Sequence, residues 1–271
     1  MKSKFIFILL LLIALAFTTG IAFAQQVSKE DEATALAKKV QNPISDLVSL
    51  PFQNSLNFGY GPDEEMQYIL NIQPVIPLKL TRDWNLITRA ILPVIDTPWP
   101  ESKFGMGDLD VSLFFSPSKP SKFLWGVGPV LSFPSATDEI LGAEKWSAGP
   151  TAAGIYINGP WVNGLLINNL FSYAGNSDRT NVNQMLIQPF INYDLPQGWS
   201  VGSSLEITAD WKEKDNDNRW TIPVGGGVSK VFAVGKQSMN LSIAAFKNIK
   251  KPDIIGPDWT LEITVQLLFP K

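Results

Sequence analysis

The side chains with potential for chemistry are carboxylates, an arginine and several amides, spaced by even numbers of residues. Asp108 and Asp110 are two residues apart, and Glu206 and Asp210 are four apart. On an extended strand these spacings put both carboxylates of a pair on one face. Paired carboxylates can serve in glycoside hydrolysis or bind a metal ion. No third type of ligand accompanies either pair, so the pairs alone do not indicate such a site.

Two residue types on which many enzymes depend are missing. The chain contains no histidine and no cysteine. Ser-His-Asp catalysis, the commonest general base and the commonest metal ligand are therefore excluded, and so are thiolate ligands. The loop Asp215-Asn216-Asp217 lacks the full calcium-loop pattern, which leaves weak surface binding of Ca²⁺ as the alternative. We expect no enzyme, no metal site and no cofactor.

The first residues predict export. Lys2 and Lys4 form a positive region, residues 5–17 are nearly all apolar, and Ala22-Phe23-Ala24 gives a small-x-small cleavage pattern. Residues 1–24 are therefore expected to be a signal peptide cleaved after Ala24, with an uncleaved anchor as the alternative. The net charge of −3 has no basic cluster, which argues against nucleic acid as a partner.

The rest of the chain has the pattern of strands. In the last of them, Leu261, Ile263, Val265, Leu267 and Phe269 share one face while Glu262, Thr264 and Gln266 share the other. A period of two fits a soluble sandwich with its apolar face inward, or an outer-membrane barrel with its apolar face toward lipid. About twelve such segments are expected, near 52–60, 66–78, 83–94, 106–116, 122–133, 145–157, 161–173, 182–193, 198–211, 219–232, 237–247 and 257–269.

The connections favour the barrel. Those after even-numbered segments are short, such as 80–82 and 158–160, whereas those after odd-numbered segments tend to be longer and more charged, such as 134–144 and 212–218. Eight of the nine Trp residues lie at strand ends, as in the two aromatic girdles of a membrane barrel. We therefore predict an all-β fold, a transmembrane antiparallel β-barrel formed by residues 51–271, in the outer membrane of a Gram-negative bacterium.

Residues 25–50 precede the strands as a short N-terminal helical segment. Residues 32–40 favour a helix, Asn42-Pro43 breaks it, and Ile44, Leu47, Val48 and Leu50 have amphipathic spacing. The segment is expected to plug the barrel or to rest on its periplasmic rim. A partly ordered leader is the alternative.

Six prolines lie inside predicted strands, where each removes a ladder hydrogen bond: Pro74, Pro93, Pro129, Pro150, Pro189 and Pro223. A closed barrel has no edge strand to accommodate them. We expect bulges at these positions, with a local opening of the wall near one of them as a second hypothesis.

Several motifs carry a family resemblance. They are Asn42-Pro43-Ile44, Leu50-Pro51-Phe52-Gln53-Asn54, Asn71-Ile72-Gln73-Pro74-Val75-Ile76-Pro77, Trp84-Asn85-Leu86-Ile87-Thr88-Arg89, Gly105-Met106-Gly107-Asp108 and Trp125-Gly126-Val127-Gly128-Pro129. From about residue 37 onward the chain resembles the outer-membrane channel family known as "MetA-pathway of phenol degradation", often mislabelled neuromedin U. The resemblance implies a barrel of about twelve strands and uptake of small, often aromatic or hydrophobic compounds, and brings no catalytic residues with it.

The parity of each strand assigns the residues that line the lumen and contact the permeant. The candidates are Arg89, Asp108, Asp110, Glu206, Asp210, Glu262, Gln73 and Gln188. Arg89 lies one strand from Asp108 and Asp110, so a lumenal ion pair is expected. It would either form a constriction that orients the permeant or only balance charges inside a narrow barrel.

The sequence thus predicts a monomeric outer-membrane channel for passive diffusion of small hydrophobic or amphipathic solutes. Its expected partners are outer-membrane lipid and lipopolysaccharide, the barrel-assembly machinery, which reads the closing strand, and a small-molecule permeant. A closed structural barrel whose loops bind a surface partner is the alternative, and a secreted soluble sandwich is a third possibility.

Overall fold

The computed structural model describes residues 26–119 and 121–270, without the side chains of residues 26–32. The expected signal peptide lies outside these residues. The described part contains helix α2 (Gln26–Val40), the short helix α3 (Asn216–Arg219) and a 3-10 turn at Pro196–Gly198. None of its helices is long and apolar enough to cross a membrane.

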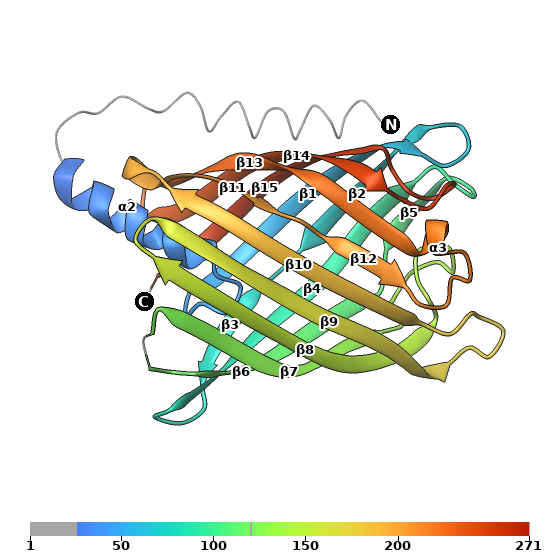
Figure 1. The fold of residues 1–271 in the computed structure, drawn as a ribbon, viewed down its shortest axis with the longest axis horizontal. Helices are drawn as coiled ribbons and strands as arrows, with labels where there is room; N and C mark the ends of the chain where they lie inside the picture. Colours follow the sequence, from blue (N-terminus) through green and yellow to red (C-terminus); the bar gives the residue numbers. More distant parts are fainter. Residues whose placement is uncertain (1–25, 120, 271) are drawn as a thin grey trace.

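The strands form one closed antiparallel sheet (Figure 1). They are β1 (Val48–Tyr60), β2 (Glu65–Ile72), β3 (Val75–Lys79), β4 (Trp84–Thr97), β5 (Lys103–Met106), β6 (Leu109–Pro117), β7 (Phe123–Phe133), β8 (Lys145–Asn158), β9 (Trp161–Gly175), β10 (Asn183–Asp194), β11 (Trp199–Ser204), β12 (Ile207–Asp210), β13 (Trp220–Val234), β14 (Gln237–Lys250) and β15 (Trp259–Phe269). The segments β2 and β3, β5 and β6, and β11 and β12 each follow one another along a single strand. The result is the predicted barrel of twelve strands.

The barrel closes where its first strand, β1, pairs with its last strand, β15. Along β1 and β15 the register runs from Val48 opposite Phe269 to Phe58 opposite Trp259. The first strand therefore begins at Val48 and not at Phe52 as expected, because the residues from Val48 to Pro51 pair with the end of the closing strand.

The connections are sorted between the two ends as predicted. One end carries short turns at residues 80–83, 118–122, 159–160, 195–198 and 235–236, and the other carries the longer loops 134–144, 176–182, 211–219 and 251–258. Helix α2 lies at the short-turn end, on the same side as the C-terminus (Figure 1). Two connections at the long-loop end, 61–64 and 98–102, are shorter than the pattern predicts.

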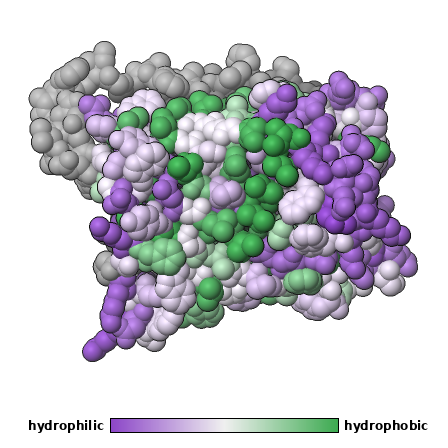
Figure 2. All heavy atoms as spheres, viewed as in Figure 1, coloured by the Kyte–Doolittle hydropathy of each residue, from purple (hydrophilic) through white to green (hydrophobic). Residues whose placement is uncertain are grey.

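The outer wall is apolar between two levels of aromatic rings. Trp84 and Trp125 stack edge to face at the short-turn end with 5.9 Å between ring centroids, and Trp211 and Trp220 do so at the long-loop end at 5.6 Å. Figure 2 shows apolar residues gathered over the middle of one face, with hydrophilic residues concentrated toward the ends. This is the surface that a membrane barrel presents to lipid.

Two of the irregularities in the ladder affect the lumen. Val94 pairs with Met106 but Ile91 pairs with Asp110, so one extra residue is accommodated at Gly107–Asp108 as a β-bulge. Between β13 and its neighbour, pairing stops after Gly202 opposite Gly227 and resumes at Thr208 opposite Thr221.

Candidate functional site

Two cavities occupy the lumen and meet at three residues. The inner cavity, of about 250 Å³, lies toward the short-turn end and is lined partly by residues 39–45 of the N-terminal segment. The outer cavity, of about 750 Å³, lies toward the loops. Gln73, Arg89 and Glu206 line both cavities. We call this level of the lumen the partition.

A chain of hydrogen-bonded polar side chains crosses three neighbouring strands at the partition. Arg89 on β4 donates from Nη2 to Oε1 of Gln73 at 2.9 Å. Gln73, between β2 and β3, donates to Oε1 of Gln53 on β1. Gln53 and, on β15, Glu262 both line the inner cavity. The two hydrogen bonds hold the guanidinium of Arg89 against the wall of the barrel.

Glu206 completes the partition from the strand that contains β11 and β12. It lines both cavities together with Arg89, and Asp110 lines the outer one. Its side chain is accessible from the lumen. Among the described residues no carboxylate forms a salt bridge with Arg89, so the two charges attract across open lumen.

The other predicted lumenal residues divide between the cavities. Gln188 lines the inner cavity and donates to Oγ of Ser204 at 3.1 Å. Asp110 and Asp210 line the outer cavity, and Asp210 also accepts from the backbone N–H of Lys212 at 2.8 Å. Seven of the eight predicted residues therefore line one cavity or both.

Asp108 is the exception, and the expected ion pair between Arg89 and Asp108 is absent. Its carboxylate accepts from the backbone N–H of Ala136 at 3.1 Å and from that of Ala143 at 2.7 Å. The cause is the bulge at Gly107, which ends the strict alternation of faces on which the prediction depended. Asp108 holds the 134–144 loop instead of lining the cavities.

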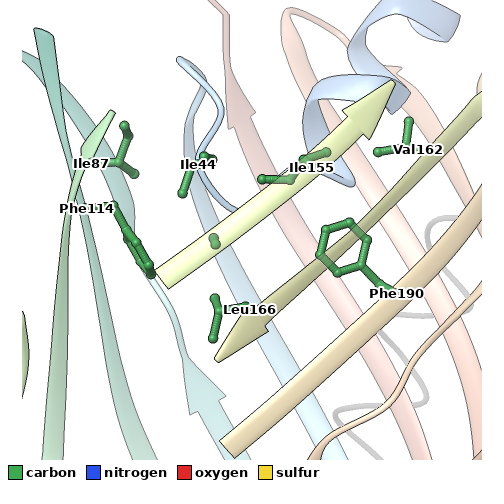
Figure 3. Packing of buried hydrophobic residues seen from close by; sticks show 8 residues of the cluster. Ile44, Ile87, Phe114, Ile155, Val162, Leu166 and Phe190 are labelled. Atoms are coloured by element: carbon green, nitrogen blue, oxygen red, sulfur yellow. The ribbon is translucent and has the colours of Figure 1, made fainter. Parts of the chain in front are cut away.

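The N-terminal segment lies inside the barrel at the short-turn end. Ile44 packs against Ile87, Phe114 and Ile155, all on inward faces (Figure 3). Leu36, Ala37 and Leu47 pack against Val231 and Leu268. Residues 36–47 thus pack against inward side chains of the wall, and we call them the plug.

Polar contacts between the plug and the wall are sparse. Gln41 donates to Oγ of Ser229 at 3.3 Å. Lys39 pairs with Asp46 at 2.9 Å, within the segment itself. Buried Asn240 beside this segment leaves its Oδ1 without a hydrogen-bond partner among the described residues. The plug is therefore held chiefly by two apolar clusters, one around Ile44 and one around Leu36, Ala37 and Leu47.

The outer cavity has a mixed lining. Apolar side chains come from the wall and from the 251–258 loop: Ile91, Val130, Leu170, Leu186, Ile254 and Ile255. Its charged residues comprise five carboxylates and two guanidinium groups: Asp110, Glu206, Asp210, Glu213, Asp253, Arg89 and Arg219. The cavity can therefore accept an apolar body together with a polar end.

The ionic contacts in the loops outside the wall include one made by Asp138. Asp138 accepts from the N–H of Ile140 at 3.0 Å and pairs with Lys103 at 3.1 Å. The backbone bond, followed by the lysine, holds the pKa of the Asp138 carboxyl below its usual value. This contact fixes one end of the 134–144 loop to β5.

The interrupted part of the wall lies beside the partition. On β13 it includes Pro223, which has no N–H to donate, followed by Gly225, Gly226 and Gly227. A Cβ at Gly225 or Gly227 would collide with backbone carbonyl oxygens of β14. Glu206 stands on the facing strand, within the unpaired stretch. The ladder is thus interrupted on one side of Pro223. The bulges expected at Pro129 and Pro150 are absent, because these two prolines lie opposite each other in an unbroken register.

The structural comparisons match the fold of this chain to that of known membrane proteins. The COG4313 outer membrane channel from Pseudomonas putida F1 superposes with a TM-score of 0.62 at 15% identity, over 82% of this chain and 94% of the channel. The chain has the fold of an outer-membrane channel. The outer membrane phospholipase of Salmonella typhi is also similar, with a TM-score of 0.42 at 12% identity over 89% of this chain and 98% of that one. No protein-family model and no curated protein matches the sequence.

The outer-membrane fold orients the molecule. In outer-membrane barrels short turns face the periplasm and long loops face outward. In that orientation the plug lies toward the periplasm and the outer cavity lies toward the cell exterior. The resemblance noted from the sequence is supported as far as an outer-membrane channel fold. Its phenol-degradation label is not tested by this comparison.

Two parts of the site were missed by the sequence analysis. Gln53 was not assigned to the lumen. It lies opposite Thr264, which was predicted to face inward, so the alternation of β1 would have placed Gln53 on the inward face as well. Ile254 and Ile255 lie in a loop, where no periodicity indicates that they reach the outer cavity.

Proposed function

We propose that the protein is an outer-membrane channel for passive diffusion of small hydrophobic or amphipathic compounds. The observation that carries the proposal is the outer cavity of about 750 Å³, which combines an apolar lining with charges gathered at the partition. Its size and mixture are typical of sites for small organic molecules. The barrel acts as a monomer and without catalysis, so flux follows the concentration gradient.

Charge at the partition orients the solute within this proposal. An apolar body contacts Ile91, Leu170 and Leu186, while a polar end lies near Arg89 and Glu206. Because apolar and charged side chains lie along the same path, an amphipathic molecule can leave water while its polar group keeps polar partners.

The interrupted ladder supplies a route through the wall. Residues 203–207 and 222–226 face each other without backbone pairing, and the plug obstructs the straight path to the periplasm. In the proposal, a hydrophobic solute passes from the partition into the membrane between β12 and β13 by transient widening of this stretch.

The test uses a dye that intact outer membranes exclude. Uptake of 1-N-phenylnaphthylamine is measured in cells expressing the wild-type protein or Thr208→Trp, whose indole fills part of the outer cavity. Ile243→Trp, at a lipid-facing position of β14 that is 43% exposed, is the matched control. We expect Thr208→Trp to lower protein-dependent uptake several-fold and Ile243→Trp to leave it unchanged.

A closed barrel that binds a surface partner is the second candidate, and the plug favours it. Ile44 is only 5% exposed and is surrounded by inward side chains. If uptake does not exceed that of cells without the protein, for the wild type and for a plug-deleted variant alike, the closed barrel replaces the channel as the better account.

A further inference from the structure

Lys247 is a cation on the lipid-facing side of the barrel. It lies on β14, whose outward residues Ile243 and Ile249 are 43% and 64% exposed. Its cross-strand neighbours are Val224 on β13 and Trp259 on β15. An ammonium group among exposed apolar side chains requires either water or an anion close to it.

The contacts of Lys247 place it at the outer membrane–water boundary. Its Nζ lies 5.5 Å from the centroid of the Trp259 ring, and Trp259 belongs to the aromatic level at the long-loop end. Indole rings mark the headgroup region of a bilayer. The ammonium therefore lies at the depth of lipid headgroups and below the loops that a soluble partner would reach.

No acidic side chain of the described protein neutralises Lys247. Two acidic residues of the neighbouring loops are bound to other lysines: Asp258 pairs with Lys251 at 3.0 Å and Asp217 with Lys250 at 3.2 Å. Among the salt bridges of the described residues none includes Lys247. The counter-ion is thus expected to come from the membrane.

We propose that Lys247 and Trp259 form a binding site for a phosphate group of lipid A, the membrane-embedded part of lipopolysaccharide. The ammonium pairs with the phosphate, the indole packs at the glucosamine level, and Val224 and Phe58 lie against the acyl chains. Charge and depth together select an anionic lipid of the outer leaflet. The site is independent of transport.

The test measures lipid binding directly. The full mature protein in nonionic detergent is titrated with diphosphoryl lipid A, and bound lipid is counted by native mass spectrometry. Removing one lysine–phosphate contact, worth about 1 kcal/mol, should weaken binding by about fivefold in Lys247→Gln. Lys247→Arg should keep most of the affinity. Lys236→Gln, in the periplasmic turn at residues 235–236, is the control for loss of one charge.

Two results would overturn the proposal. One is equal affinity for diphosphoryl lipid A in the wild type and Lys247→Gln. The other is equal affinity of the wild type for diphosphoryl lipid A and for its dephosphorylated form. An unchanged mobility shift between boiled and unboiled samples confirms that each variant is folded, so that lost binding is not lost structure.

Discussion

The guanidinium of Arg89 and the side-chain amide of Gln73 share a 2.9 Å hydrogen bond at the level where the two lumenal cavities meet. The bond holds Arg89 against the wall, and Gln73 in turn donates to Gln53 on the neighbouring strand. Glu206 is left facing Arg89 across the lumen. The partition is thereby built from one fixed cation and a carboxylate that remains accessible to a solute.

Loosening the plug should open the barrel. Ile44→Asp places a charge among Ile87, Phe114 and Ile155, and an unpaired charge there costs roughly several kcal/mol. We expect single-channel conductance in planar bilayers to rise several-fold. Ile44→Val keeps the contact and should conduct like the wild type. Equal conductance of both variants would show that the plug does not limit flux.

Charges at the partition should set ion selectivity. The outer cavity has more carboxylates than guanidinium groups, so the Ile44→Asp barrel is expected to prefer cations. Adding Glu206→Gln should reduce the cation-to-anion permeability ratio, by on the order of twofold, and adding Arg89→Gln should raise it. Reversal potentials in a salt gradient measure the ratio. Asp83→Asn in a periplasmic turn is the control, and a shift as large there would refute the assignment.

Locking the interrupted wall should stop hydrophobic uptake. The chain contains no cysteine, so Leu205→Cys with Val224→Cys introduces one defined pair across the unpaired stretch. Oxidation should lower dye uptake, and reduction should restore it. Val201→Cys with Val228→Cys crosslinks a paired part of the same two strands and should have no effect. If the two crosslinks act alike, solutes do not leave through the wall at this point.

Asp108 should act on a loop and not on permeation. Asp108→Ala removes the acceptor of two backbone N–H groups, which should destabilise the 134–144 loop by about 1–3 kcal/mol. Limited proteolysis should cleave the loop faster while ion selectivity stays unchanged. Asp110→Asn, two residues along the chain, should show the reverse, with an altered selectivity and an intact loop.

The same loop should respond to acid through Asp138. Its pKa is lowered in the folded protein, first by the Ile140 N–H and then by Lys103. The stabilisation is therefore complete above the unfolded pKa of about 3.9 and is lost as the pH falls through the lower folded value. The rate at which pepsin cleaves the loop is measured in the wild type and in Asp138→Asn. The ratio of the wild-type rate to the variant rate should decline steadily as the pH rises from about 2 to 5. A constant ratio would contradict it.

The strands could be predicted because lipid and lumen impose opposite demands on alternate residues. The final strand shows this, since Glu262 and Gln266 line the inner cavity while Trp259 and Phe269 face outward. Strand ends came from turn residues and from Trp, which lies at membrane boundaries for a physical reason.

The remaining features depend on tertiary geometry that a linear pattern does not contain. A single extra residue at Gly107 moves Asp108 out of the lumen. The prolines within strands differ in whether their carbonyl groups still accept hydrogen bonds from the neighbouring strand. The carbonyl oxygen of Pro74 accepts from the N–H of Ala90, and that of Pro189 accepts from the N–H of Leu205. Pro223 differs, because it has no backbone pairing on the side of β12. The sequence does not show this difference, since it depends on how the two strands are aligned.

The pairing of β1 with β15 orders events during assembly. Residues 41–47 immediately precede β1 along the chain and end up enclosed by a wall whose last hydrogen bonds form between the first and the last strand. Leu47, the last of these residues, packs in one cluster with Leu268, next to the end of the final strand. These residues must therefore enter the lumen before the first and last strands pair, or pass through the open rim afterward. Closure of the barrel is thereby coupled to the position of residues 41–47.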